Sequence, residues 1–440
     1  MRRVCIFIFA CLWTFPCFVF CKEYRAADTG EEEKMFQSAV YGQVELLEEF
    51  LKKGININSL NEEEWSILHI AARQGYLDIV EMLLSQESQI HINAKTNTGW
   101  TALHMAVYIN HLEMTDLLVR KGANINLAND SEWTPLHLAA EQGNLEIVKF
   151  LFEKDENRRT NINAENNFGW IPLHLACLGN HHDIVLFLVQ NGSNVNAMGN
   201  DGWSSLHVAA AEGHLQVVRE LLRSGMDRGL DMDIKDSDGW TPLHIASNQG
   251  YYEVAKELID RGARMSEETN LQWTPLHIAA EAGNGSIVNL LLDRGTARGL
   301  VDINRRTADS WTALHLAVSK GHLEVADSLI LKGAILNAKT NIGWTALHEV
   351  SYKGNLEITE LLLLRSEERD VSIKDEATDN GWTALHLAAS QGRMEVVRIL
   401  IDKGANPNIL DAEGLSAADH AKEGGYAKIF ELLSPKRRSS

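Results

Sequence analysis

The sequence predicts an all-α solenoid, in which pairs of short helices stack side by side and short β-hairpin fingers join successive pairs. The first observation behind this prediction is a segment, Trp-Thr-Pro-Leu-His-Leu-Ala at Trp133, that recurs along most of the chain. The second is that each copy continues with two apolar stretches at helical spacing. The third is an Asn-rich segment that closes each copy, such as 122–130. Units of this size cannot bury their apolar faces alone, so neighbouring units must stack.

The repeated segment is regular enough to define the units. Tryptophan begins ten copies, at Trp65, Trp100, Trp133, Trp170, Trp203, Trp240, Trp273, Trp311, Trp344 and Trp382. A degenerate copy, LSAADHA, follows at Leu415. Copies spaced by 33 residues alternate with copies spaced by 35 to 38 residues, which indicates tandem duplication of a pair. The extra residues fall after the second helix, in five enlarged loops: Ser85–Ile92, Glu153–Ile162, Arg223–Met232, Asp293–Ile303 and Leu364–Lys374.

Local chemistry supports the start and the end of the first helix. Thr or Ser follows nine of the ten tryptophans, where a side-chain oxygen can cap a helix N-terminus. Proline follows in several copies, at the first helical position, where its missing N–H is no loss. Ile171 cannot cap, so we expect its repeat to fray more readily. Gly, or Asn at Asn110 and Asn180, ends the helix, because these residues tolerate a left-handed turn.

This T-P-L-H signature with its 33-residue period resembles the ankyrin repeat. The resemblance covers residues 32–434, as an N-terminal capping repeat at 32–63, ten full repeats at 64–413 and a C-terminal capping repeat at 414–434. It implies an ankyrin-repeat solenoid that binds another protein along its concave face. It also implies a structural role for the motif histidines, which hydrogen-bond the backbone of their own and the adjacent repeat. These are His69, His104, His137, His174, His207, His244, His277, His315, His348 and His386.

The N-terminus predicts export. Arg2 and Arg3 precede an apolar stretch, residues 4–20, and charged residues follow, as in a secretory signal peptide. We therefore predict a signal peptide at 1–21, a linker at 22–31 and a secreted or secretory-pathway protein. The alternative is that residues 4–20 form an uncleaved membrane anchor. We expect the protein to contact a membrane only if this segment is retained. Four of the five cysteines lie in residues 1–21, so the remaining chain has one thiol and no internal disulfide.

Composition and motifs exclude several classes of function. The formal net charge is −19, and the only basic cluster is the tail at 435–440, so a nucleic-acid partner is not expected. No sequence motif for a phosphate loop, zinc protease or serine hydrolase occurs, so we expect no catalytic site and no cofactor. Cys177 occupies an alanine position and is expected to be buried. His111, His181, His214 and His322 share a turn that we interpret as solvated, and His181-His182-Asp183 lacks a further metal ligand.

The sequence predicts a non-enzymatic, monomeric scaffold that binds a protein of unknown identity. The ten tryptophans either pack on the next finger or form an aromatic strip for a partner. Variable residues at the finger tips and at the end of the first helix are the expected selectors of the partner. Alternative functions are a secreted effector or latrotoxin-like toxin component, and a membrane-anchored cytosolic adaptor. Asn129, Asn191 and Asn284 head N-glycosylation sequons, which we expect to tolerate a glycan.

Overall fold

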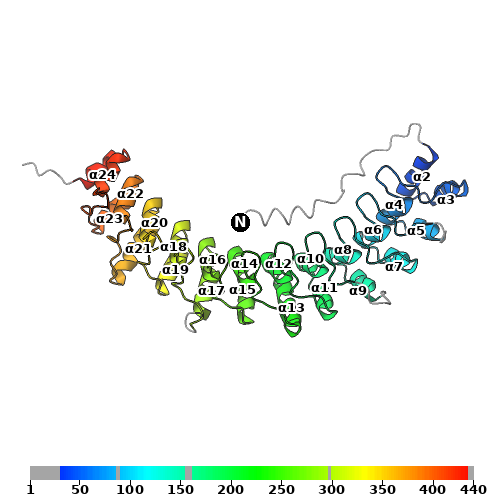
Figure 1. Ribbon diagram of the computed structural model, residues 1–440, viewed down its shortest axis with the longest axis horizontal. Coiled ribbons are helices and arrows are strands. Elements are labelled where there is room, and N and C mark those ends of the chain that lie inside the picture. The colour runs from blue at the N-terminus through cyan, green and yellow to red at the C-terminus, as the bar shows by residue number, and fades with distance from the viewer. Residues whose placement is uncertain (1–29, 86–89, 154–160, 296–298, 435–440) are drawn as a thin grey trace, which may run out of the picture. The chain divides into compact units, whose positions relative to one another are not determined.

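The computed structural model describes residues 30–85, 90–153, 161–295 and 299–434 (Figure 1). The chain divides into two compact units, with the boundary between Asp130 and Ser131. The sequence predicted one continuous array over this range, so the division is a finding of the structure. The predicted signal peptide, most of the predicted linker and the basic tail lie outside the described residues.

The described residues are helical, as predicted. The first unit contains α2 (Glu31–Val40), α3 (Val44–Lys52), α4 (Ile67–Gln74), α5 (Leu77–Leu84), α6 (Ala102–Tyr108) and α7 (Leu112–Arg120). The second unit begins with α8 (Pro135–Gln142), α9 (Leu145–Glu153), α10 (Pro172–Leu178), α11 (His182–Gln190), α12 (Ser205–Ala211), α13 (Leu215–Gly225), the short 3₁₀ helix η2 (Met226–Arg228), α14 (Pro242–Gln249) and α15 (Tyr252–Asp260). It continues with α16 (Pro275–Ala282), α17 (Gly285–Gly295), α18 (Ala313–Lys320), α19 (Leu323–Leu331), α20 (Ala346–Lys353), α21 (Leu356–Glu368), α22 (Ala384–Ser390), α23 (Met394–Asp402), α24 (Ala417–Glu423) and α25 (Ala427–Leu433).

The second unit is built of two rows of helices (Figure 1). The first helix of each repeat packs on the first helix of the next repeat, from α8 through α24. The second helices form a parallel row from α9 through α25, and each also packs on the first helix of its own repeat. The core lies between the rows, where aliphatic side chains of both helices, such as Leu138 and Ile147, are at most 1% exposed. This stacking confirms the predicted solenoid.

The first helices begin as the sequence predicted. In α14, the Thr241 hydroxyl oxygen accepts a hydrogen bond from the His244 amide (3.4 Å), and Pro242 occupies the first helical position. α10 begins at the equivalent residue although Ile171 has no hydroxyl. The Ile171 side chain is buried, and burying such a side chain contributes about 1.5–3 kcal/mol. This contribution offsets the missing cap, worth about 1 kcal/mol, and therefore opposes the predicted fraying.

The turns between the two helices have the predicted left-handed backbone. Gly143 and Gly250 have φ values of 80° and 79°. Asn110 and Asn180, which replace the glycine in two repeats, have φ values of 58° and 62°. Asn is the residue that adopts this conformation most readily after glycine. The substitution therefore preserves the direction in which the second helix leaves the turn.

The predicted β-hairpin fingers are tight turns and not strands. In the finger before α14, the Asp236 amide donates to the Trp240 carbonyl (2.9 Å), and the Trp240 amide donates to the Asp236 side chain (2.8 Å). The chain reverses within these residues, so little backbone remains to extend a ladder. Among the described residues, the isolated β-bridges are Met198–Ser204, Ala377–Thr383 and Leu410–Ser416.

The enlarged loops partly lengthen the second helix. The extra residues extend α13 and α17 to 11 residues and α21 to 13 residues, whereas the second helices of several short repeats have 9. The amides of Leu230 and Leu300 then donate to the carbonyls of Gly225 and Gly295, which closes both extended helices in the same way. Parts of the loops after α5, α9 and α17 lie outside the described residues.

Candidate protein-binding surface

The motif histidines join successive repeats. In the second unit, His244 Nδ1 accepts from the Thr241 amide (3.1 Å) and lies 2.8 Å from the Thr241 hydroxyl. Its Nε2 donates to the carbonyl of Trp273 in the next repeat (3.0 Å). His137, His174, His207, His315 and His348 make the same contact with the next tryptophan carbonyl, and His277 makes it with Arg305. The ring is thus fixed at both nitrogens, in the way that the resemblance implied.

Burial keeps these histidines neutral. Desolvation lowers the pKa of His244 from 6.5 to about 4, although its bond to the Trp273 carbonyl acts in the opposite direction. Seven histidines of the second unit share this shift to about 4: His137, His174, His207, His244, His277, His315 and His348. Protonation of Nδ1 would also break its bond with the amide of the residue that precedes the helix. The imidazoles therefore serve as structural hydrogen-bonding groups.

The tryptophans pack against these histidines. Trp240 and His244 have ring centroids 6.1 Å apart, and Trp170 stacks on His174 at 5.6 Å. An added Cβ at Gly199, in the next finger, would lie 2.6 Å from the Trp170 indole. Trp65, Trp100 and Trp133 are 8% exposed, and the other seven are half-buried. This geometry supports the packing role, while the half-buried indoles keep one edge at the surface.

The turn that was interpreted as solvated is a second point of contact between repeats. His181 Nε2 donates to the Glu141 carbonyl (2.9 Å), and His214 and His322 make the equivalent bonds to Leu178 and Glu281. Asn284 and Arg393 reach the corresponding carbonyls through their own side chains. The interpretation as a solvated turn is therefore wrong for His181, His214 and His322, whereas His111 accepts from the Met114 amide of its own repeat (3.3 Å). The five residues with this contact each cap the end of the first helix in the preceding repeat.

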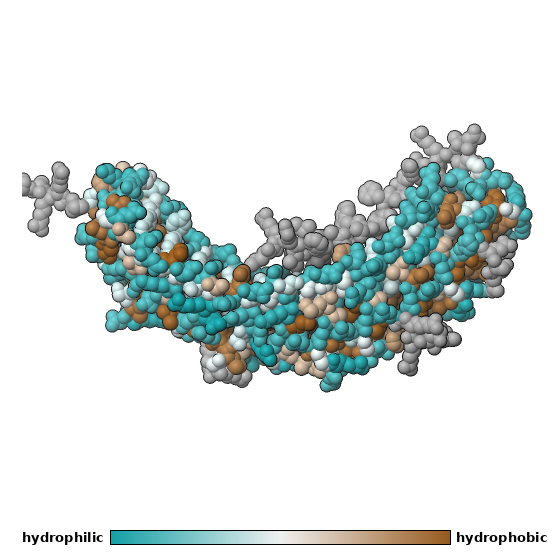
Figure 2. All heavy atoms as spheres, in the orientation of Figure 1, coloured by the Kyte–Doolittle hydropathy of each residue, from teal (hydrophilic) through white to brown (hydrophobic). Residues whose placement is uncertain are grey.

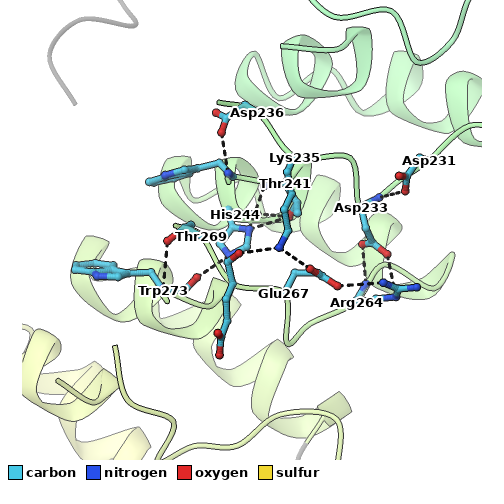
Figure 3. Close-up of polar contacts among 12 residues, drawn as sticks. Asp231, Asp233, Lys235, Asp236, Thr241, His244, Arg264, Glu267, Thr269 and Trp273 are labelled. Carbon is cyan, nitrogen blue, oxygen red and sulfur yellow. Dashed lines mark hydrogen bonds and ion pairs between the residues drawn. The ribbon is translucent and has the colours of Figure 1, made fainter. Parts of the chain in front are cut away.

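Polar contacts tie neighbouring fingers together (Figure 3). Lys235 Nζ lies 2.9 Å from the Glu267 carboxylate and donates to the Glu268 carbonyl in the next finger (2.9 Å). Arg264 donates its amide to Asp233 (2.9 Å) and its guanidinium to Glu267 (3.2 Å). The hydrogen bond from Lys235 lowers the pKa of Glu267, whereas burial raises the pKa of Asp233. These charges are already compensated within the chain.

The finger tips carry the exposed and variable side chains. We define the tip row as the residues two positions before each tryptophan, or before Leu415, in the second unit: Ser131, Phe168, Asp201, Asp238, Leu271, Asp309, Ile342, Asn380 and Glu413. All are exposed except Phe168, which is half-buried. The surface is otherwise largely hydrophilic, with separate apolar patches on the face that Figure 2 shows. The tip row therefore combines the variation and the accessibility that were expected of residues that select a partner.

The ends of the first helices border the tips and differ among repeats. Glu141, Asn248, Ser319 and Ser390 are half-buried at equivalent positions, and Tyr352 is 41% exposed there. The Tyr352 ring lies 5.6 Å from that of Trp344, which forms an aromatic pair in this repeat.

Glu349, in the same helix as Tyr352, was missed in the sequence. It is 8% exposed, at a position where the other full repeats have aliphatic residues or Met. Ser319 donates to its carboxylate (2.8 Å), and Lys353 Nζ lies 3.0 Å away. An alignment of the repeats would have identified Glu349, because it is the one charged residue at an otherwise apolar position.

The structure limits the predicted glycosylation sites. Asn129 is 9% exposed, and Asn284 Nδ2 donates to the carbonyls of Ser247 (2.7 Å) and Asn248 (3.0 Å). A glycan on either nitrogen would require these environments to open, so the expectation that both tolerate one is wrong. Asn191 Nδ2 also donates to a carbonyl, that of Phe187 (2.8 Å), but this residue is exposed at the end of α11, where a glycan meets solvent.

The described residues offer neither a reactive thiol nor a cluster of metal ligands. Cys177 is fully buried, and burial raises the pKa of its thiol, which disfavours the nucleophilic thiolate. Across the described residues, no group of three or more His, Cys, Asp or Glu side chains has the geometry to hold a metal ion. Within that part of the chain, no helix is long and apolar enough to cross a membrane.

The C-terminal repeat lacks the motif histidine, and two other residues make contacts in its place. Asp419 replaces the motif histidine and accepts from the Ser416 amide (2.9 Å). His420, one residue later, lies 2.7 Å from Asp411, and its ring centroid is 4.3 Å from that of Trp382. The degenerate sequence therefore still contacts the last full repeat.

Comparison with known proteins agrees with this architecture. Family models described as ankyrin repeats (3 copies) match residues 89–166, 157–236, 226–299, 296–375 and 350–439, and one described as ankyrin repeats (many copies) matches 51–106. Notch-regulated ankyrin repeat-containing protein A of Danio rerio is 42% identical over 66 residues, 14% of this chain. The match spans 59% of the length of that relative. A crystal structure of the ankyrin repeat domain of Bcl-3, a unique member of the IkappaB protein family, is 27% identical, with a TM-score of 0.48, and covers 53% of this chain and 99% of that chain.

The matched segments together extend over most of the sequence, from residue 51 to residue 439. They coincide with the repeats that the structure shows as helix pairs. The chain therefore belongs to the ankyrin-repeat family.

Proposed function

We propose that the chain is a binding scaffold whose partner contacts the tip row and the adjoining ends of the first helices in the second unit. Ankyrin repeats are protein-interaction modules, so the general function follows from the family. The choice of surface rests on one observation: the motif histidines that join the repeats are constant in the ten full repeats, whereas the exposed tips change from Asp to Leu, Ile, Asn or Glu. Exposed side chains that packing does not constrain are free to select a partner.

A comparison of two variants of the full chain tests this surface. The tip-row variant has serine at Asp201, Asp238, Leu271, Asp309 and Ile342. The matched control has serine at three exposed acidic and two exposed aliphatic residues of the second-helix row: Glu360, Glu395, Asp402, Leu331 and Leu364. Peptides selected from a random displayed library on the native chain are then measured against both variants.

We expect peptides whose affinity falls at least about tenfold on the tip-row variant, because contacts at a few central residues dominate binding. The same peptides should bind the control variant as they bind the native chain. Equal thermal unfolding of the three proteins establishes that folding is unchanged. A selection in which no peptide distinguishes the tip-row variant from the control would refute the proposed surface.

We also propose that the protein enters the secretory pathway, as the segment 1–21 predicts. Expressed with a C-terminal tag in a eukaryotic secretory cell, the mature chain is expected to begin near residues 22–28 and to lose mass on glycosidase treatment. Because Asn191 is the exposed sequon, Asn191→Gln is expected to abolish that loss, whereas Asn284→Gln leaves it unchanged. Mass spectrometry of the secreted protein measures both. An intact Met1 on an unglycosylated, cell-retained chain would contradict secretion.

A further inference from the structure

The residues of the tip row are immediate neighbours in space. The carbonyls of Phe168, Asp238, Leu271, Asp309 and Asn380 accept hydrogen bonds from the finger of the next repeat, at 2.8 to 3.3 Å, from Asn200, Asn270, Ala308, Asn341 and Ala412. The Ser237 hydroxyl reaches the Asp201 carbonyl in the same way (3.2 Å). Each finger is thereby held beside the next, and their exposed side chains form one line.

The carboxylates of this line lack ion-pair partners within the part of the chain that the structure describes. Asp201, Asp238, Asp309 and Glu413 are exposed, and none forms an ion pair among the described residues. The acidic residues elsewhere on the second unit often do, as in the pairs Glu268–Arg305 and Asp327–Arg365. The four residues before each tryptophan, from Trp170 to Trp382, contain no Lys, Arg or His. The line therefore carries four carboxylates without an ion pair among five neutral residues, and we call it the acidic strip.

Two aliphatic side chains interrupt the acidic strip. Leu271 is 66% exposed and Ile342 is 56% exposed, among the most exposed large apolar side chains that the structure describes. Both occupy the tip-row position that holds an aspartate in Asp238 and Asp309 of adjacent repeats. In the repeat of Ile342, the Trp344–Tyr352 pair adds apolar surface at the same end of the row. Exposed aliphatic and aromatic groups framed by charge are typical of an interaction site.

The spacing of the row matches an extended polypeptide. Packed helices lie about 8–10 Å apart, so successive tips are separated by roughly that distance. A polyproline II chain, the extended conformation with three residues per turn, rises about 3.1 Å per residue, so about three residues span one repeat. Because every third side chain of such a chain points the same way, side chains at every third position can meet consecutive tips.

We propose that the tip row binds an extended, basic segment of a protein partner, which places basic, basic, aliphatic, basic and aliphatic side chains opposite Asp201, Asp238, Leu271, Asp309 and Ile342. The assignment rests on the binding surface proposed above and adds the chemistry and register of its ligand. Charge complementarity selects Lys or Arg and speeds association. The two aliphatic contacts, about six residues apart in the ligand, fix the register.

Synthetic peptides on the full chain test the register. The first peptide, of about 13 residues, has Lys, Lys, Leu, Lys and Leu at every third position and Ser or Thr elsewhere. The second has the same composition with the five residues rearranged. We expect the first peptide to bind about tenfold more tightly, with an affinity that falls as salt is raised, because exposed charges are screened. Equal affinity of the two peptides would overturn the register.

A charge exchange tests the central contact. Asp309→Lys is expected to weaken binding of the first peptide severalfold and to improve binding of a peptide that has Glu in place of its third Lys. Asp402→Lys, on the second-helix row, is the matched control because it changes the net charge of the protein by the same amount. We expect it to change the affinity for either peptide only slightly, through this change in net charge. If both substitutions act alike, the contact at Asp309 is refuted.

The displayed-library selection separates this inference from the proposed surface. Tip-dependent peptides enriched in Lys or Arg, with aliphatic residues about six positions apart, would support both. Tip-dependent peptides without basic enrichment would overturn the ligand chemistry and leave the surface intact. The absence of any tip-dependent peptide would overturn the two together.

Discussion

Acidification from pH 7 to pH 5.5 is expected to reduce the stability of the second unit sharply. Its seven buried motif histidines, such as His174 and His244, have a pKa of about 4 when folded and 6.5 when unfolded. Below pH 6.5 the unfolded chain binds protons that the folded chain does not, so the free energy of unfolding falls as the pH falls towards 4. Well above pH 6.5 both states are neutral, and this dependence disappears.

The expected size is large because the same group recurs in every repeat. At pH 5.5 each histidine costs about 1.4 kcal/mol, and the seven together cost on the order of 10 kcal/mol. Whole domains have stabilities of about 5–15 kcal/mol, so the unit should approach unfolding in this range.

Urea denaturation followed by circular dichroism at several pH values measures this dependence. The variant His244→Gln removes one titrating group, so its free energy of unfolding should change less steeply with pH, by about 1.4 kcal/mol per pH unit. A free energy of unfolding that is constant between pH 7 and pH 5 would contradict the neutral, buried state of the histidines.

The substitution Gly143→Ala is expected to lower the free energy of unfolding by about 3 kcal/mol, whereas Gly192→Ala should cost only about 1–2 kcal/mol. Both glycines have positive φ, 80° and 96°, which costs an L-residue about 1–2 kcal/mol. They differ in their surroundings. A Cβ at Gly143 would lie 2.4 Å from the His181 ring, whereas nothing lies within 4 Å of one at Gly192. The ring would have to move and give up its bond to Glu141, a further loss of about 1 kcal/mol or more.

A double-mutant cycle isolates the contact between the two repeats. In the background of His181→Ala, the cost of Gly143→Ala should fall to that of Gly192→Ala, since only the backbone term remains. Urea denaturation of the four proteins gives the coupling free energy. Equal costs of Gly143→Ala in both backgrounds would show that the imidazole does not constrain this turn.

Much of the repeat architecture was predictable because its determinants are local. The hydroxyl that caps α14 lies three residues before His244, and the left-handed Asn110 and Asn180 stand where other repeats have glycine. Such short-range patterns are visible in one sequence when they recur ten times. The same locality explains why the all-α fold was predicted correctly. The finger turns were predicted as hairpins because a chain reversal is a local feature. How little strand pairing follows the reversal, three isolated bridges among the described residues, is set by the packing of neighbouring fingers.

What only the tertiary structure decided depends on contacts about one repeat apart. His181, Asn284 and Arg393 differ chemically, yet each donates to a backbone carbonyl 36 to 41 residues earlier, and no side-chain pattern identifies a carbonyl. Likewise, Asn284 and Asn191 have equivalent sequons, and only packing places the Asn284 side chain against the preceding repeat while Asn191 stays exposed and bonds within its own helix end. The sequence by itself determined the repeat, its caps and its motif histidines. The stacking determined which remaining side chains are used between repeats and which, as in the tip row, stay available to a partner.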